Sequence, residues 1–368
     1  MTYYFVYTFL LLMDAIARFE RKFRPLLYWS ALFGLYIFSG FRYEVGCDWI
    51  GYINQYKLMA AMESSRALWF LDPGQSLLIV TLQWLGLPYP YLNVVTSALF
   101  FIGLHALAKR QPNPLAFIVL AFPILIINMP MAAIRQGAAI GFLCLAFTSF
   151  LDRRTIRYIL FIILGSLFHF SILIFLTPAP FVKRDISFRA IAWVLCLAIP
   201  LFAALFTVDA AQQAVNTYVG TSREAFGAAF RLGVVGLTGL AFLLFFRQRW
   251  RYYFPGDYKL VWINALGMVL ALALLPISSV IGDRIGYYLI PVQLMIFARL
   301  PYLYPGRLRQ VVSVLPYAAL TLVFLVWTIS SYHFKLCYLP YRMFVFQEDP
   351  VYNYQQVLGQ ISEKREGL

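Results

Sequence analysis

Three arginines lie where an apolar chain has no ordinary use for a cation. Arg135 begins one apolar stretch, Arg231 follows a long loop, and Arg284 lies in a short polar break between two apolar stretches. A guanidinium group stays protonated and presents a planar fork suited to bidentate phosphate binding. If the three meet in one cavity, we expect them to bind a pyrophosphate group and neutralise the charge that develops as it departs, without a divalent metal. The alternative is three independent residues that reach separately to the membrane edge.

A second polar group follows Arg42. Asp48, Tyr52 and Tyr56 recur at i, i+4 and i+8, which places them on one face of a helix. Gly46 permits a turn before this helix, and Asp48 can cap it, so one interpretation is purely structural. In the functional interpretation these residues form a polar and aromatic face that lines a site for a sugar or a lipid head group, and Arg42 also contacts substrate. Asp48 would then orient an acceptor sugar or act as general base, and the tyrosines would offer stacking surfaces.

His169 and Ser171 lie in the middle of the apolar run 158–182. A lone histidine is most often a packing residue, but this one lies where the run must break. Its unperturbed pKa of about 6.5 leaves much of it neutral at working pH. We therefore prefer His169 slightly over Asp48 as the general base for an attacking hydroxyl.

Three further side chains complete the candidate substrate-binding set. Gln136 follows Arg135, Asp283 precedes Arg284, and Tyr288 lies one helical turn beyond. Asp283 and Arg284 could instead form a simple loop pair. Ionisable groups at membrane depth are costly, which favours a functional role for them. No spacing resembles a metal site, and we expect no cofactor.

The composition indicates an integral membrane protein. Of 368 residues, 62% are hydrophobic and 12% are charged, with a mean hydropathy of +0.73. A soluble domain averages roughly 45–50% apolar and about 25% charged residues. The net charge of +14 would suggest nucleic acid in a soluble protein, but no basic patch interleaved with aromatic residues lies outside the apolar segments, so we expect no nucleic-acid partner.

The apolar segments predict an all-α polytopic fold with about ten transmembrane helices. They run over 2–17, 26–41, 75–86, 91–108, 115–128, 137–151, 158–182, 190–206, 233–247, 260–276, 285–298 and 311–331. Basic clusters between them mark cytoplasmic loops by the positive-inside rule. These clusters are Arg18/Arg21/Lys22/Arg24, Lys109/Arg110, Arg153/Arg154/Arg157, Lys183/Arg184/Arg189, Arg247/Arg249/Arg251/Lys259 and Arg299/Arg307/Arg309.

Two apolar segments cannot be full crossings if successive helices alternate between the two sides of the membrane. Residues 158–182 lie between two cytoplasmic clusters but are too short to cross twice, which predicts a re-entrant hairpin with its tip near His169. Residues 75–86 are expected to form a re-entrant or interfacial helix. Re-entrant backbone needs surrounding protein or a water-filled cavity, so we expect a polar cavity that opens to the outside.

The remaining organisation follows from the same topology. We expect one transmembrane domain over 1–368, with extracytoplasmic loops 42–74 and 207–232 and an extracytoplasmic tail 332–368. Cys47 and Cys337 would then share the outer side. Whether they pair is left open, because a disulfide needs geometry that spacing does not give.

The motifs together resemble the EpsG-type polysaccharide polymerases, through their order and spacing over residues 2 to about 341. The motifs are Arg42 with Gly46-Cys47-Asp48, Tyr52 and Tyr56; Asp72-Pro73-Gly74; Ile134-Arg135-Gln136-Gly137; Phe168-His169 with Ser171; Asp283-Arg284 with Tyr288; and Leu339-Pro340-Tyr341. This chain departs from the pattern in having Cys47 where a small hydroxyl residue is more usual and Asp72 where Glu is usual.

The resemblance implies a Wzy-like role at the outer face of the bacterial cytoplasmic (inner) membrane. The enzyme would join oligosaccharide repeat units carried on undecaprenyl pyrophosphate into an exopolysaccharide, O-antigen or capsule. It also implies a fold related to the GT-C glycosyltransferases and partners such as a flippase and a chain-length regulator. Membrane lipid is expected to surround the protein whatever its activity.

Three other functions compete with this prediction. A ligase or another lipid-linked glycosyltransferase would add sugar once rather than repeatedly. A flippase for lipid-linked oligosaccharides would also need an arginine-lined cavity, but with polar groups deep in the spans. A membrane O-acyltransferase is disfavoured because no second catalytic histidine lies in a suitable pattern.

Overall fold

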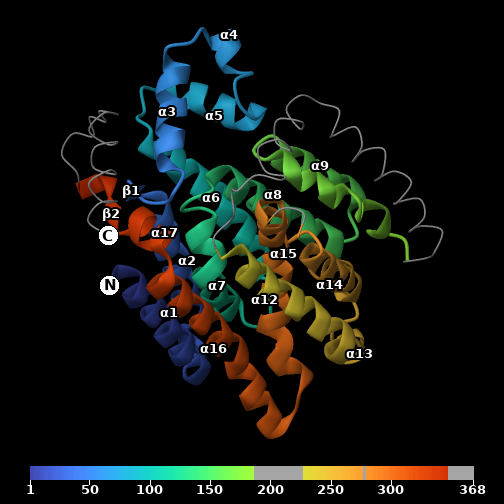
Figure 1. The fold of residues 1–368 in the computed structure, drawn as a ribbon. Coiled ribbons are helices and arrows are strands. Elements are labelled where there is room, and N and C mark those ends of the chain that lie inside the picture. Colours follow the sequence, from blue (N-terminus) through green and yellow to red (C-terminus); the bar gives the residue numbers. More distant parts are fainter. Residues whose placement is uncertain (186–226, 277–278, 347–368) are drawn as a thin grey trace.

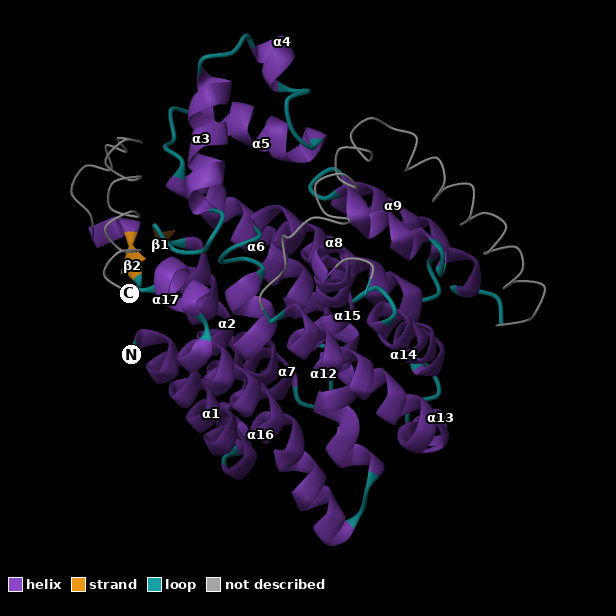
Figure 2. Ribbon diagram, in the orientation of Figure 1, coloured by secondary structure: helices purple, strands orange, loops and turns teal. Residues whose placement is uncertain are grey.

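The computed structural model describes residues 1–185, 227–276 and 279–346. Within these ranges the chain is almost entirely helical, with one pair of two-residue strands (Figures 1 and 2). The predicted apolar segment 190–206, most of the loop 207–232 and the tail beyond 346 lie outside the described residues. The fold is thus the predicted all-α fold over the part of the chain that is described.

The helices vary from one turn to seven turns in length. The α-helices are α1 (Thr2–Phe19), α2 (Arg24–Gly40), α3 (Trp49–Ala60), α4 (Ser64–Ala67), α5 (Pro73–Trp84), α6 (Pro90–Ala108), α7 (Pro114–Ala121), α8 (Ile134–Leu151), α9 (Thr155–Ser166), α12 (Ala228–Ala241), α13 (Arg247–Tyr253), α14 (Tyr258–Leu272), α15 (Ser279–Arg299), α16 (Gly306–Ser330) and α17 (Tyr332–Tyr338). Short 3₁₀ or π segments are η1 (Arg21–Phe23), η2 (Phe122–Ile126), η3 (Phe170–Leu176), η4 (Ala179–Phe181), η5 (Phe242–Phe246), η6 (Leu300–Leu303) and η7 (Phe344–Phe346), and the strands are β1 (Arg42–Tyr43) and β2 (Arg342–Met343).

Five of the described helices are long and apolar enough to cross a membrane. They are Pro90–Ala108, Ile134–Leu151, Ala229–Tyr253, Ser279–Leu303 and Gly306–Ser330. Three shorter apolar helices accompany them: Pro114–Ile126, Thr155–Ser166 and Tyr258–Leu272. The protein is therefore an all-α membrane protein, and the total of about ten crossings stays a prediction.

Glycines allow the central helices α6 and α8 to touch backbone to backbone. A Cβ atom on Gly141 would lie 2.3 Å from the carbonyl oxygen of Leu99, and one on Gly103 would lie 1.9 Å from that of Gly141. Small residues at helix interfaces permit such close approach in membranes. This close packing fixes the position of α8, which begins beside Arg135.

The chain doubles back within residues 158–182, as predicted. Helix α9 ends at Ser166, and η3 begins at Phe170 after a break at 167–169. The two limbs lie against each other, because the Tyr158 hydroxyl donates a hydrogen bond to the Phe175 carbonyl oxygen at 2.5 Å. The tip falls at His169, and its depth in the bilayer stays a prediction.

Helix α5, the second segment predicted to be re-entrant or interfacial, belongs to an outer lobe with α3 and α4. This lobe projects from one end of the helical bundle (Figure 1). Buried residues of α3 and α5 form a small core of their own, which includes Tyr52, Tyr56, Ile79 and Leu82. The position of α5 relative to the bilayer, re-entrant or interfacial, stays a prediction.

The loop after α2 is tied to the segment that follows α16. Cys47 and Cys337 form a disulfide with a Cα–Cα distance of 4.8 Å, which answers the question left open by the sequence. Strand β1 pairs antiparallel with β2, Arg42 opposite Met343. These contacts hold the residues around Asp48 in place at the base of the outer lobe.

Candidate functional site

Three helices are joined near their N-terminal ends, and together they carry Arg135, Gln136, Arg231, Asp283, Arg284 and Tyr288 of the predicted site. Helices α8, α12 and α15 begin at Ile134, Ala228 and Ser279. The Gln136 side chain in α8 donates a hydrogen bond to the Arg284 carbonyl oxygen in α15 at 2.6 Å. Because helix N-termini carry a partial positive charge, their convergence favours an anion.

Arg231 and Asp283 connect α12 to α15. The guanidinium group donates through Nε at 3.0 Å and through Nη2 at 2.7 Å to the two carboxylate oxygens. Both side chains are only 14% exposed, and Arg231 also lies over the ring of Tyr287, 5.6 Å from its centroid. Asp283 therefore pairs with Arg231 rather than with its neighbour Arg284, which corrects the simple loop pair considered above.

Arg135 pairs with Asp72 from the outer lobe. The Arg135 Nη1 atom lies 2.8 Å from the Asp72 carboxylate, and the guanidinium group also interacts with the Tyr52 hydroxyl. The Arg135 Nε atom is buried without a hydrogen-bond partner among the described residues. A buried unpaired donor is costly unless a ligand accepts from it.

The outer lobe also contacts the tip of the hairpin. The backbone nitrogen of Gly74 donates to the Leu167 carbonyl oxygen at 2.7 Å. A Cβ atom on Gly74 would lie 2.9 Å from the same oxygen, so the close approach needs glycine. The segment Asp72-Pro73-Gly74 thus bridges Arg135 and the turn before His169.

His169, Ser171 and Tyr288 form a hydrogen-bonded triangle. The Ser171 hydroxyl lies 2.7 Å from His169 Nδ1 and 3.2 Å from the Tyr288 hydroxyl, which is itself 3.1 Å from Nδ1. His169 lies in the break between α9 and η3, outside the long apolar helices. Burial, and then the positive charges of Arg284 and Arg135, lower the pKa of His169 to about 3. The imidazole is therefore neutral, with Nε2 left to contact a substrate.

Asp48 lies close to the same arginines. It occupies the N-cap position of α3, as the structural interpretation predicted, but its side chain makes no capping hydrogen bond. The residue is exposed, yet surrounding protein raises the pKa of its carboxyl, and Arg284 and Arg135 offset part of that rise. Asp48 is thus an accessible carboxylate with a higher proton affinity than usual.

Gly46 places Asp48 there through a contact that only glycine can make. Its φ is +100°, and a Cβ atom would lie 2.1 Å from the Met131 carbonyl oxygen. Met131 belongs to the turn that leads into α8 and Arg135. The turn at Gly46 predicted from the sequence is confirmed, and it joins two parts of the site.

The other residues predicted to bind substrate hold the protein together. Arg42 is buried and donates to the carbonyl oxygens of Val45 and Ser39 and to the side chain of Asn93. Tyr56 is buried in the core of the outer lobe, and its hydroxyl donates to a backbone carbonyl oxygen. In the structure these two residues position the site, and their contact with substrate stays a prediction.

The charges of the site are nearly balanced. Three arginines meet three aspartates, of which Asp72 was absent from the predicted set although its motif belonged to the family resemblance. The signal that could have identified it is an acid outside the cytoplasmic loops, just before a proline that begins a helix. Among the described residues, no group of three or more His, Cys, Asp or Glu side chains is arranged to hold a metal ion.

The fold and the site together define an all-α membrane protein with a polar, arginine-rich site where three helices begin. The family model for the EpsG family matches residues 25–343. The chain therefore belongs to the EpsG family, and the resemblance predicted from its motifs is confirmed. No curated protein and no solved structure matches the chain.

Proposed function

We propose that the protein joins oligosaccharide repeat units linked to undecaprenyl pyrophosphate into a polysaccharide at the outer face of the cytoplasmic membrane. Membership of the EpsG family supports polysaccharide polymerisation. The observation that carries the finer proposal is that α8, α12 and α15, which bear Arg135, Arg231 and Arg284, are joined by hydrogen bonds near their N-terminal ends. Such a site suits a leaving group with several negative charges.

The arginines would bind the pyrophosphate without losing their ion pairs. Each guanidinium group has five N–H donors. Arg231 uses two of its nitrogens on Asp283, and Arg135 uses Nη1 on Asp72 and keeps its buried Nε free of any partner among the described residues. The aspartates hold the guanidinium groups in fixed orientations, so little reorganisation is needed as negative charge develops on the departing phosphate.

The proton of the attacking hydroxyl would pass to Asp48. A bond forms between the acceptor oxygen and the anomeric carbon of the donor, while the bond from that carbon to the pyrophosphate oxygen breaks. A raised pKa makes Asp48 a better base, whereas the lowered pKa of His169 makes it a worse one. We therefore now prefer Asp48, and in-line attack would invert the anomeric configuration.

His169, Ser171 and Tyr288 would then bind sugar hydroxyls. A neutral imidazole and two hydroxyl groups can donate and accept hydrogen bonds, as a sugar requires. Tyr52 would act indirectly, because its hydroxyl interacts with the Arg135 guanidinium group. Gln136 would hold the start of α8 against α15 through its hydrogen bond to the Arg284 carbonyl oxygen.

The disulfide supports an outward-facing site. Disulfides persist in oxidising compartments outside the cytoplasm, and the Cys47–Cys337 bond lies next to Asp48. A relationship to the GT-C glycosyltransferases, independence from metal ions, and partnership with a flippase and a chain-length regulator belong to the same proposal.

The test is an assay with purified protein in nanodiscs, the lipid-linked repeat unit and EDTA, resolved on a gel. A ladder of chain lengths supports a metal-independent polymerase. We expect Arg135→Gln, Arg231→Gln and Arg284→Gln each to slow chain growth by at least 100-fold, the range for loss of a group that stabilises developing charge. Arg157→Gln, an exposed arginine of α9, is the matched control and should act as wild type.

Other outcomes separate the rival functions. A single addition indicates a ligase or simple transferase. Movement of intact substrate between leaflets, without any product, supports the flippase. If all three arginine variants keep the wild-type ladder, the pyrophosphate proposal is wrong.

A further inference from the structure

A charged pocket lies at the other end of α15 from the candidate site. It has a volume of about 420 Å³ and is lined by the ends of α1, α15 and the following η6, by the start of α16 and by α7. On α15, Arg284 belongs to the candidate site and Ala298 lines this pocket. At 1.5 Å per residue the two lie roughly 20 Å apart along the helix, which is about two-thirds of the thickness of a bilayer core of about 30 Å.

The pocket is strongly basic. Four arginines line it, Arg18, Arg21, Arg24 and Arg309, and no acidic residue is among the lining side chains. The only carboxylate bonded to any of these arginines among the described residues is Asp14, which is buried beneath Arg18. The pocket therefore keeps an excess of positive charge that favours an anion.

Contacts with other side chains hold two of these arginines in position. Asp14 accepts from Arg18 Nε at 3.0 Å and from Nη2 at 2.7 Å, and it also accepts from the Tyr317 hydroxyl at 2.8 Å. The Arg18 guanidinium lies 5.1 Å from the centroid of the Tyr317 ring. Arg309 lies in the same way 5.1 Å from the ring of Tyr302.

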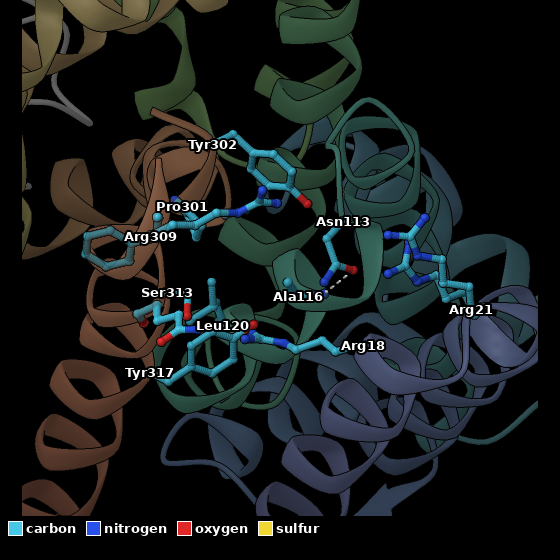
Figure 3. Close-up of a pocket in the computed structure, with 15 residues that line it drawn as sticks. Arg18, Arg21, Asn113, Ala116, Leu120, Pro301, Tyr302, Arg309, Ser313 and Tyr317 are labelled. Atoms are coloured by element: carbon cyan, nitrogen blue, oxygen red, sulfur yellow. Dashed lines mark hydrogen bonds between the residues drawn. The ribbon is translucent and has the colours of Figure 1, made fainter. Parts of the chain in front are cut away.

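Figure 3 shows the two sets of cations facing each other. Arg18 and Arg21 enter from α1 and the turn after it, and Arg309 enters beside Tyr302 from the other wall. Asn113 lies between them. Donors on opposite walls, with aromatic rings that fix their planes, suit a phosphate group held from both sides.

The helices on either side of the pocket present apolar surface outward. On α1 the exposed side chains near the pocket are Leu12, Ile16 and Phe19, and on α16 they are Leu308, Val311 and Leu315. Leu120 and Phe297 line the pocket itself. A ligand with a phosphate in the pocket would find hydrocarbon-facing surface directly beside it, which a free anion does not need.

We propose that this pocket binds the phosphate headgroup of an anionic phospholipid from the leaflet next to the basic loops. Basic pockets between membrane helices on the cytoplasmic side recognise such headgroups. The lipid would join α1 to α16 at the end of the bundle remote from the candidate site, so this inference is independent of the proposed polymerase activity.

The test is binding of phosphatidylglycerol to delipidated full-length protein in detergent, measured by native mass spectrometry and by thermal melting. Phosphatidylcholine and sodium phosphate serve as the other two ligands. We expect phosphatidylglycerol to bind at least 10-fold more tightly than phosphatidylcholine. Arg21→Gln/Arg309→Gln should remove that preference, whereas Arg157→Gln/Arg247→Gln, which removes two exposed arginines outside the pocket, should keep it.

The remaining results overturn the proposal. Equal binding of both phospholipids by the wild type excludes recognition of the anionic headgroup. Full stabilisation by sodium phosphate alone assigns the pocket to a free anion rather than a lipid. An Arg21→Gln/Arg309→Gln variant that elutes as a folded protein and still prefers phosphatidylglycerol places the lipid elsewhere.

Discussion

Replacing Gly46 with alanine should disable the protein without unfolding it. The new methyl group would lie 2.1 Å from the Met131 carbonyl oxygen and 2.9 Å from the Ala132 Cα atom. Both are backbone atoms, so no side-chain rotation relieves the contact. Because a carbon and a carbonyl oxygen approach to about 3.3 Å, the loop must shift by roughly 1 Å.

The effect of that shift on the reaction rate can be estimated. A displacement of about 1 Å in a catalytic arrangement costs on the order of 100-fold, which is roughly 2.7 kcal/mol of activation free energy. The positive φ of Gly46 adds about 1–2 kcal/mol of backbone strain in any other residue. The polymerisation rate of Gly46→Ala should therefore fall about 100-fold, while the disulfide still forms.

The assay is initial rate of chain growth in nanodiscs, with thermal melting as a check on folding. Gly51→Ala is the matched control, because a Cβ atom there meets nothing within 4 Å and alanine favours the helix by about 1 kcal/mol. A wild-type rate for Gly46→Ala would refute the placement of Asp48 against the turn before Arg135. A loss in Gly51→Ala as large as in Gly46→Ala would refute it equally.

Three further predictions concern the charged pair, the disulfide and pH. Arg231→Gln should lower the free energy of unfolding by about 3 kcal/mol, because it leaves Asp283 nearly buried and unpaired. Adding Asp283→Asn should restore most of that stability. Equal stability of the single and double variants in a denaturant titration would contradict this prediction. Replacing both Cys47 and Cys337 with serine should cost about 2–5 kcal/mol in the same titration. Maleimide labelling of these two cysteines in the wild type should require prior reduction, whereas Cys144 is a free thiol in either case. Labelling of Cys47 or Cys337 without reductant would show that the bond is absent. The pKa of Asp48 is raised, and a general base must be ionised to accept a proton, so kcat/KM should fall on acidification at a pH above the ordinary aspartate pKa of about 3.9. His169→Gln should keep this decrease at acidic pH. Loss of the decrease in that variant would return the role of base to His169.

Features set by local sequence were predicted well. The break at 167–169 was predicted from the basic clusters at both ends of one apolar run. The turn at Gly46 was predicted because glycine has no side chain to hinder it. Each depends on a few neighbouring residues and on the preference of cations for one side of a membrane.

Features set by distant pairs were not predicted. The partner of Arg135 is Asp72, 63 residues earlier, and the partner of Arg231 is Asp283, 52 residues later. A sequence shows that these charges exist but not which of them meet, because that depends on how the helices pack. For the same reason Arg42 looked like a binding residue, although the structure satisfies it with protein acceptors.

The bond between Cys47 and Cys337 also sets an order of biogenesis. The two cysteines are 290 residues apart, so at 5–20 residues per second the nascent chain exposes the first about 15–60 s before the second. The five long apolar helices found among the described residues all precede Cys337, and they must leave the ribosome before the bond can close. The loop that carries Asp48 is therefore fixed in place only after nearly the whole chain has been synthesised.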